Sequence, residues 1–189
     1  MNNKINTELM EYFLDFSVAI TAFPKFHLQG TGQMESYYNT VNDICKKIFE
    51  ELLTTFHSLD VKAKTTGDRS VLNKGIVRDI LGSEKFGPIA RNIIKLWYLG
   101  TWYQLPASWR ETFGASEKDI DRVVSSQAYV EGLLWPTLGV NPRAAKAPGY
   151  GTWAEHPSSD KVNSFDNLKG VNSEVSNSKE VNSHTKILN

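Results

Sequence analysis

One stretch of the chain, residues 34–56, constrains the fold more than any other. Its apolar residues recur every three to four positions, which is the spacing of one face of an α-helix. They are Met34, Tyr37, Tyr38, Val41, Ile44, Cys45, Ile48, Phe49, Leu52, Leu53 and Phe56. Polar and charged residues occupy the positions between them and keep the opposite face wet. The pattern predicts a long amphipathic helix.

Other segments also favour helices. Residues 72–81 align their apolar side chains, and Gly82 then ends the segment. Pro88 can begin the next helix, because a proline loses no hydrogen bond at the first helical position. Ser116-x-x-Asp119 resembles a capping box and predicts a helix through Tyr129. No segment alternates apolar and polar residues between turn dipeptides, so the expected fold class is all-α without a sheet.

An apolar run from Tyr12 to Phe23 could be mistaken for a signal peptide. Glu8, Glu11 and Asp15 lie before or within it, whereas a signal peptide has a basic leader and a core without acids. We therefore expect this run to belong to the first helix of the fold.

The sequence changes character twice after the helical part. We expect a single helical domain over residues 7–138, followed by an extended arm rich in proline and glycine over residues 139–157. Residues 158–189 repeat Val-Asn-Ser among serine, asparagine and lysine and offer few apolar side chains. Ordering costs about 1–2 kcal/mol per residue, so this tail is expected to be disordered.

Charge and composition narrow the range of partners. The chain of 189 residues has a net charge of zero. It therefore offers no electrostatic reason to bind nucleic acid or an anionic membrane surface. No run approaches the roughly 18 apolar residues of a spanning helix, so direct membrane insertion is not expected.

The usual motifs of catalysis and metal binding are absent. There is no nucleophile elbow, no His-Glu-x-x-His and no phosphate-binding loop. The histidines are far apart, and Cys45 lies on the apolar face of its helix, where an inert buried thiol is expected. The acids of the helices are interpreted as solvated charges: Glu50, Glu51, Asp119 and Asp121. We expect no catalytic, cofactor-binding or metal-binding residues in this chain.

One glycine pattern has to be weighed against a nucleotide site. Residues 149–154 match the Gly-x-Gly-x-x-Ala dinucleotide fingerprint. That fingerprint works only between a strand and a helix, whose amides face the pyrophosphate. Pro142 and Pro148 precede it and Pro157 follows it, so no βαβ unit is expected here.

Aromatic residues are the remaining candidates for function. Trp97, Tyr98, Trp102 and Tyr103 crowd the end of the helix that begins near Pro88, over a wider sector than one core contact needs. They could form the core of the domain, an interface with another protein, or both. A sugar-binding platform of Trp97, Trp102 and Trp153 is a third possibility.

Three blocks of sequence, at residues 96–102, 123–135 and 141–154, resemble one known family in the same order. They read LWYLGTW, VVSSQAYVEGLLW and NPRAAKAPGYGTWA. The family is the small subunit of membrane-bound, FAD-dependent sorbitol, fructose and glucose dehydrogenases. The resemblance covers roughly residues 9–154 and is strongest from residue 90 onward.

The resemblance implies a division of labour. A large subunit holds the FAD and oxidises the sugar, and a cytochrome c subunit carries electrons onward to quinone. The small subunit has no catalytic residues and is needed for the large one to mature and to be exported. The aromatic residues and the Pro/Gly arm are our hypothesis for the surface that contacts such a FAD-dependent large subunit. They are Trp97, Tyr98, Trp102, Tyr129, Trp135, Pro148, Gly149, Tyr150, Gly151 and Trp153.

The sequence departs from the family in two respects, because it has no twin-arginine leader and it carries the Asn/Ser-rich tail. The family location is the periplasm, attached to the inner membrane through the complex, and the alternative without a leader is the cytoplasm. Two other functions stay open. One is a standalone helical module that binds a sugar or a peptide. The other is a self-sufficient flavin- or nicotinamide-dependent dehydrogenase built on the glycine pattern.

Overall fold

The structure is a computed structural model that describes residues 2–143 and 145, with side chains from residue 7 onward. Its first compact unit ends at Pro142. Helices dominate the described residues, and a single two-stranded ribbon accompanies them. The all-α class is therefore confirmed. The expected tail at 158–189 and most of the expected arm at 139–157 lie outside the described residues.

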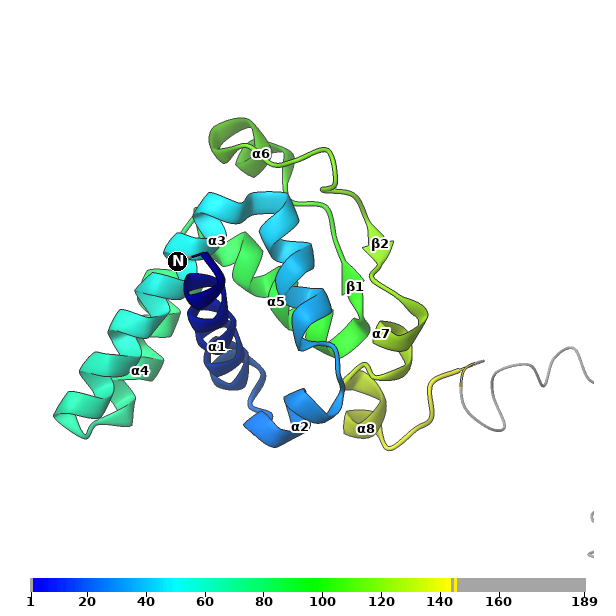
Figure 1. Ribbon diagram of the computed structural model, residues 1–189, viewed down its shortest axis with the longest axis horizontal. Helices are drawn as coiled ribbons and strands as arrows, with labels where there is room; N and C mark the ends of the chain where they lie inside the picture. Colours follow the sequence, from blue (N-terminus) through cyan, green and yellow to red (C-terminus); the bar gives the residue numbers. More distant parts are fainter. Residues whose placement is uncertain (1, 144, 146–189) are drawn as a thin grey trace, which may run out of the picture. The chain divides into compact units, whose positions relative to one another are not determined.

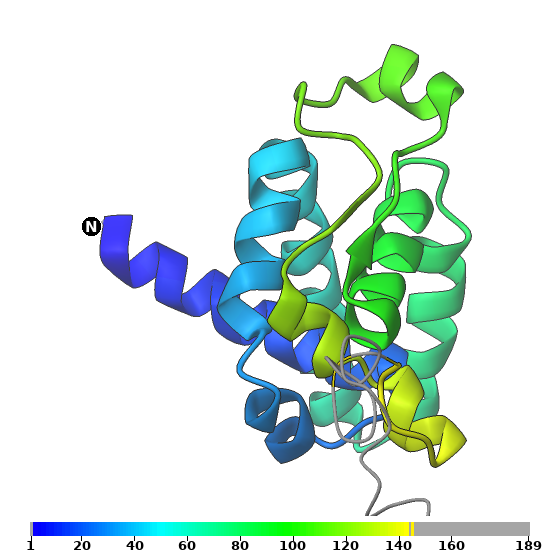
Figure 2. The same ribbon diagram turned by 90° about the vertical axis from the view of Figure 1, so that its right-hand side faces the viewer.

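The elements follow one another along the chain with short connections (Figures 1 and 2). They are α1 (Asn2–Thr21), α2 (Lys25–Gly30), α3 (Met34–Thr66), α4 (Arg69–Gly75), the π-helical η1 (Ile76–Leu81), α5 (Gly87–Leu99), β1 (Thr101–Trp102), α6 (Ala107–Phe113), β2 (Arg122–Val123), α7 (Ser126–Val130) and α8 (Leu134–Leu138).

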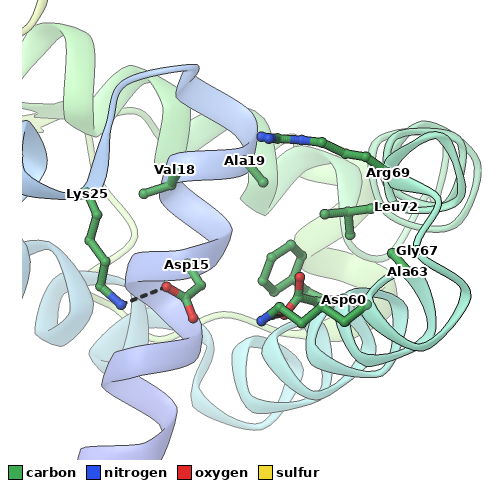
Figure 3. Close-up of a pocket in the computed structure, with 11 residues that line it drawn as sticks. Asp15, Val18, Ala19, Lys25, Asp60, Ala63, Gly67, Arg69 and Leu72 are labelled. Carbon is green, nitrogen blue, oxygen red and sulfur yellow. Dashed lines mark hydrogen bonds and ion pairs between the residues drawn. The ribbon is translucent and has the colours of Figure 1, made fainter.

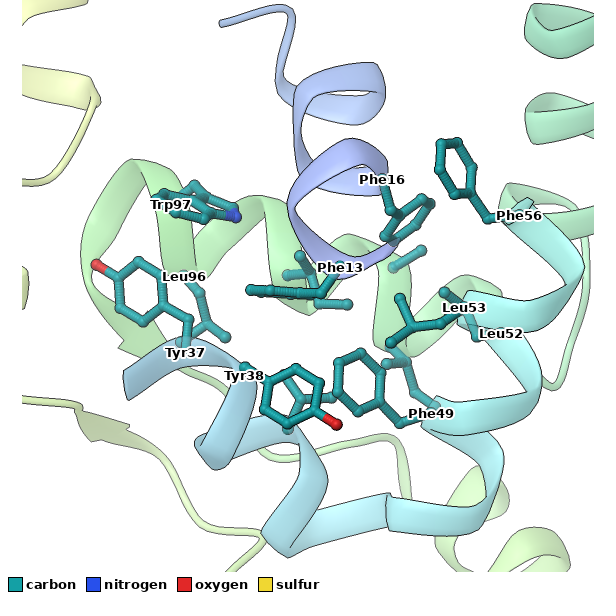
Figure 4. Packing of buried hydrophobic residues seen from close by; sticks show 14 of the residues in the cluster. Phe13, Phe16, Tyr37, Tyr38, Phe49, Leu52, Leu53, Phe56, Leu96 and Trp97 are labelled. Carbon is teal, nitrogen blue, oxygen red and sulfur yellow. The ribbon is translucent and has the colours of Figure 1, made fainter. Parts of the chain in front are cut away.

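The amphipathic face predicted for residues 34–56 is the face that α3 buries. All of its apolar residues except the partly buried Met34 are buried. Phe13 of α1 lies between α3 and α5, with its ring 5.7 Å from that of Phe49 and 6.3 Å from that of Trp97 (Figure 4). The core therefore forms where α1, α3 and α5 meet, and the first apolar run is a core helix as expected.

Helix α3 is interrupted at Cys45, whose backbone (φ −143°, ψ 42°) is not helical. The neighbouring carbonyl of Ile44 accepts a hydrogen bond of 3.0 Å from the backbone N–H of Ser116 instead. A buried carbonyl needs a partner, and a distant loop supplies it where the helical ladder is broken. This hydrogen bond attaches the middle of α3 to the segment that follows α6.

The local signals for helix ends were informative. Residues 69–81 form α4 and η1, and the chain leaves the helix at Gly82 as predicted. Helix α5 begins at Gly87 with Pro88 in its first turn, also as predicted. Within the described residues, none of the helices combines the length and apolarity needed to cross a bilayer.

The prediction that the fold contains no sheet was wrong in one detail. Strands β1 and β2 pair antiparallel, with Thr101 opposite Val123 and Trp102 opposite Arg122. Each strand has only two residues, so neither could show the alternation by which strands are recognised in a sequence. The ribbon matters because it joins the end of α5 to the segment before α7.

Candidate functional site

The end of α5 is the point where the first two blocks of the family resemblance meet. The Leu133 N–H donates to the carbonyl of Trp97 at 2.9 Å, and the Val124 N–H donates to the carbonyl of Gly100 at 2.9 Å. Residues 96–102 and 123–135 are thus paired through their backbones on both sides of α7.

Two glycines allow this close approach. Gly100 adopts a left-handed conformation (φ +65°), and a Cβ there would lie 2.4 Å from the carbonyl carbon and oxygen of Ala128. A Cβ at Gly132 would lie 2.8 Å from the carbonyl oxygen of Tyr98. Only a residue without a side chain fits at these positions, so the chain packs backbone against backbone here.

Both views place α2 and α8 at this end of the unit (Figures 1 and 2). The elements here carry several aromatic and apolar side chains that are partly or fully exposed. We call the following residues the aromatic surface: Phe23, Phe26, Tyr98, Tyr129, Trp135 and Leu138. Phe26 is 74% exposed and Leu138 is 60% exposed. Exposed apolar side chains next to aromatic rings are typical of protein-binding surfaces.

Neighbouring elements hold the aromatic surface in place. The Tyr98 hydroxyl donates to the carbonyl of Thr21 at 3.1 Å, and its ring packs edge-on against Phe23 at 5.9 Å. The Trp135 indole N–H donates to the carbonyl of Tyr129 at 2.7 Å, and the two rings lie 5.2 Å apart. The rings are therefore oriented before any partner arrives, which reduces the entropy lost on binding.

Two tryptophans expected at the interface belong to the core instead. Trp97 is 1% exposed and Trp102 is 0% exposed. Helix α5 ends at Leu99, so Trp102 and Tyr103 do not continue the helical sector that the sequence suggested. In this fold both rings are covered, so neither is exposed to a partner or to a sugar. Of the described interface candidates, Tyr98, Tyr129 and Trp135 remain.

The helix predicted from the Ser116-x-x-Asp119 pattern was wrong as well, because the chain is not helical again until Ser126. Asp119 is not a solvated charge: it is 3% exposed and accepts a hydrogen bond of 2.9 Å from the Trp102 indole N–H. Its carboxylate also accepts from the Leu105 N–H at 3.2 Å to each oxygen. Asp121, by contrast, is exposed and accepts from the Gln104 N–H at 2.6 Å.

No single feature of the sequence marked Asp119 as a buried anchor. The one available signal was the nearby Trp102, whose indole N–H needs an acceptor once the ring is buried. Asp119 stands 17 positions away along the chain. Sequence spacing alone could not join the two.

The groups with potential reactivity are held in structural environments. The Cys45 thiol is buried and donates to the carbonyl of Val41, in agreement with the inert thiol expected. Burial, with a smaller contribution from Asp119, raises the pKa of Cys45 to about 12. His57 stacks on Tyr12 at 4.0 Å, and His27 packs against Phe23 at 5.3 Å. No group of histidines, cysteines and acids in the described part of the chain could hold a metal ion.

The third block of the resemblance begins at Asn141 and continues beyond the described residues. The expected interface residues Pro148, Gly149, Tyr150, Gly151 and Trp153 lie outside them, as does the whole glycine pattern at 149–154. Comparisons with known protein families, with curated proteins and with solved structures gave no match.

Proposed function

We propose that this chain is a non-catalytic accessory subunit that binds and stabilises the FAD-bearing large subunit of a sugar or polyol dehydrogenase. In this proposal the FAD and the sugar-oxidising residues belong to the large subunit, and a cytochrome c subunit can belong to the same complex. The chain contributes a contact surface and carries no cofactor. The complex is attached to the inner membrane on the periplasmic side.

The observation that carries the proposal is the pairing of residues 96–102 with residues 123–135. These blocks carry the family resemblance, and backbone contacts join them through Trp97, Gly100 and Leu133. If the two blocks resembled the family only by chance, they would not be expected to pack against each other. The pairing therefore supports a common structural role for the blocks.

The aromatic surface is the proposed contact with the large subunit. Tyrosine and tryptophan are enriched among the residues that contribute most to binding between proteins. Tyr98, Tyr129 and Trp135 are half-buried and fixed by their neighbours, while Phe26 of α2 and Leu138 of α8 are exposed. A fixed aromatic centre with apolar neighbours suits a lasting subunit contact better than a transient one.

The test is co-expression of the tagged full-length chain with an FAD-dependent sugar dehydrogenase large subunit from the same genome. We expect the two to co-purify, with flavin bound and with dye-linked sugar oxidation in the purified complex. Expression of the large subunit alone should give less flavin and less activity. Failure to co-purify, with flavin content and activity unchanged by this chain, rejects the proposal.

Surface variants show whether the aromatic surface makes the contact. Phe26→Asp and Leu138→Asp place a charge on two exposed side chains of this surface, and both should weaken co-purification. Val77→Asp is the matched control, because Val77 is 62% exposed on η1, outside the aromatic surface. Equal recovery of all three variants with the large subunit would show that the contact lies elsewhere.

A further inference from the structure

A groove lies between α1, the end of α3 and the start of α4, with Lys25 of α2 also in its lining (Figure 3). Its volume is about 440 Å³, which is within the usual range of small-molecule sites. The apolar part of its lining consists of Val18, Ala19, Phe56, Ala63 and Leu72. The groove therefore offers an apolar floor large enough for a short alkyl chain or a single ring.

Charged side chains line the rim of the groove. Lys25 pairs with Asp15 at 2.9 Å, and Lys64 pairs with Asp60 at 2.6 Å. Each carboxylate on the rim is thus already neutralised by its own lysine. These pairs leave little negative charge to attract a cationic ligand into the groove.

Arg69 is the remaining charge on the rim. Its guanidinium makes no ion pair or hydrogen bond with any residue that the structure describes, and the side chain extends from α4 toward Ala19 of α1 (Figure 3). Three cations and two carboxylates give the lining a net charge of +1. A guanidinium above an apolar floor is complementary to a molecule with an anionic head and an apolar body.

We propose that this groove binds a small organic carboxylate with an apolar chain or ring. The carboxylate would form paired hydrogen bonds with the Arg69 guanidinium, whose planar fork matches the two carboxylate oxygens. The apolar body would lie against Ala19, Phe56 and Leu72. None of the residues that line the groove belongs to the aromatic surface, so this binding does not require the proposed dehydrogenase partner.

The experiment titrates the purified full-length chain with octanoate and, in parallel, with octanamide. Nuclear magnetic resonance of the backbone amides reports where each compound binds, and calorimetry reports how tightly. Octanoate should shift the amides of residues 18–19, 63 and 67–72, and octanamide should bind at least about tenfold more weakly. The factor follows from the roughly 1.5–3 kcal/mol that a hydrogen bond to a charged group contributes.

Three variants separate the guanidinium from the general charge of the chain. Arg69→Gln should weaken octanoate binding about tenfold or more. Lys74→Gln removes a cation from the same helix but outside the groove lining, and it should leave the affinity unchanged. Ala19→Phe should fill the groove and abolish binding, with circular dichroism confirming that the variant is folded.

Several results would overturn the proposal. They are the absence of octanoate binding, equal affinity for octanamide, an Arg69→Gln variant that binds like the wild type, or shifts confined to residues outside the groove. None of these results bears on co-purification with a large subunit, so the two proposals fail separately.

Discussion

The indole N–H of Trp102 donates a hydrogen bond of 2.9 Å to the carboxylate of Asp119, and both side chains are buried. The same carboxylate accepts from the Leu105 N–H, and Arg110 lies 3.9 Å from it. One acid from an irregular segment thus satisfies two donors buried at the end of β1. This arrangement fixes the chain between β1 and β2.

Removing the Asp119 carboxylate should therefore be costly. Asp119→Ala leaves the Trp102 and Leu105 N–H groups buried without an acceptor, at about 1–3 kcal/mol for each. We expect a loss of about 2–6 kcal/mol in the free energy of unfolding, measured by urea denaturation. Asp121→Ala is the control, because that exposed side chain should cost about 1 kcal/mol or less. Similar losses for the two variants would contradict the role given to Asp119.

Gly100→Ala tests whether α7 depends on close backbone contact. Gly67 and Gly100 both end a helix in the left-handed conformation, with φ of +66° and +65°. A Cβ at Gly67 meets nothing within 4 Å, whereas at Gly100 it would meet the Ala128 carbonyl at 2.4 Å.

The left-handed conformation alone costs about 1–2 kcal/mol for a residue with a side chain. Alanine also lowers the entropy of the unfolded chain, which returns about 0.5–1 kcal/mol, so Gly67→Ala should lose about 0.5 kcal/mol in all. Gly100→Ala should lose at least about 2 kcal/mol more. Thermal melting of the two variants measures the difference. Equal losses would mean that the contact with Ala128 is loose.

Periodicity could reveal the helices of this fold because each buries a continuous face. The stripe from Tyr37 to Phe56 on α3 is visible in the sequence, and so are the breaks at Gly82 and Pro88. The region from Gly100 to Ser125 could not be read in the same way. Its structure depends on distant pairs such as Trp102 with Asp119, which no local spacing encodes, and they outweigh a local capping signal.

The candidate surface was predictable only in part, for the same reason. Aromatic richness marked Trp97, Tyr98 and Trp102 together, but exposure depends on where α5 ends and on what packs against it. Gly100 stops the helix and turns Trp102 inward, and Trp97 faces Phe13 and Tyr37 in the core. Tyr98, one position along the helix from Trp97, stays at the surface.

Trp97 and Trp135 should therefore respond differently to truncation. Trp97→Ala removes a fully buried ring and should lose about 3–5 kcal/mol of stability. Trp135→Ala removes a half-buried ring and should lose less, while weakening co-purification with the large subunit. Urea denaturation and co-purification, measured on both variants, give the comparison. Unchanged recovery of Trp135→Ala with the large subunit would remove this ring from the proposed contact.

Ala22 offers a site at which stability can be raised. It is exposed, and among the residues that the structure describes it is the one non-glycine with a positive φ, at +62°. Replacing Ala22 by glycine removes a backbone strain of about 1–2 kcal/mol from the folded protein. The same change raises the entropy of the unfolded chain, which lowers the stability by about 0.5–1 kcal/mol. Ala22→Gly should thus raise the free energy of unfolding by about 0.5 kcal/mol. Ala22→Val should lower it, since a β-branched side chain fits this conformation worse, and a melting curve of each variant shows the sign.

The Cys45 thiol should make the fold less stable in alkaline solution. Burial raises its pKa from 9.0 to about 12. The folded protein therefore keeps the proton at a pH where the unfolded chain releases it. The free energy of unfolding is therefore unaffected by the ionisation of the thiol below pH 9. It falls as the pH rises from 9 toward 12, by up to about 1.4 kcal/mol per pH unit.

Urea denaturation at pH 8, 9 and 10 tests this dependence, with Cys45→Ala as the comparison. The wild type should lose stability above pH 9, and the variant, although less stable at pH 8, should lose less over the same interval. Burial also raises the pKa of Tyr37 and Tyr38 above the ordinary tyrosine value of 10, so the two tyrosines lower the stability only at higher pH.

A thiol reagent tests the burial of Cys45 directly. At pH 8 it should react slowly with the native chain, because the thiol is buried, and quickly in urea. Cys45 is the one cysteine of the sequence, so the reaction reports on this thiol alone. Fast reaction of the native protein would mean that the thiol is accessible, and that the interruption of α3 opens in solution.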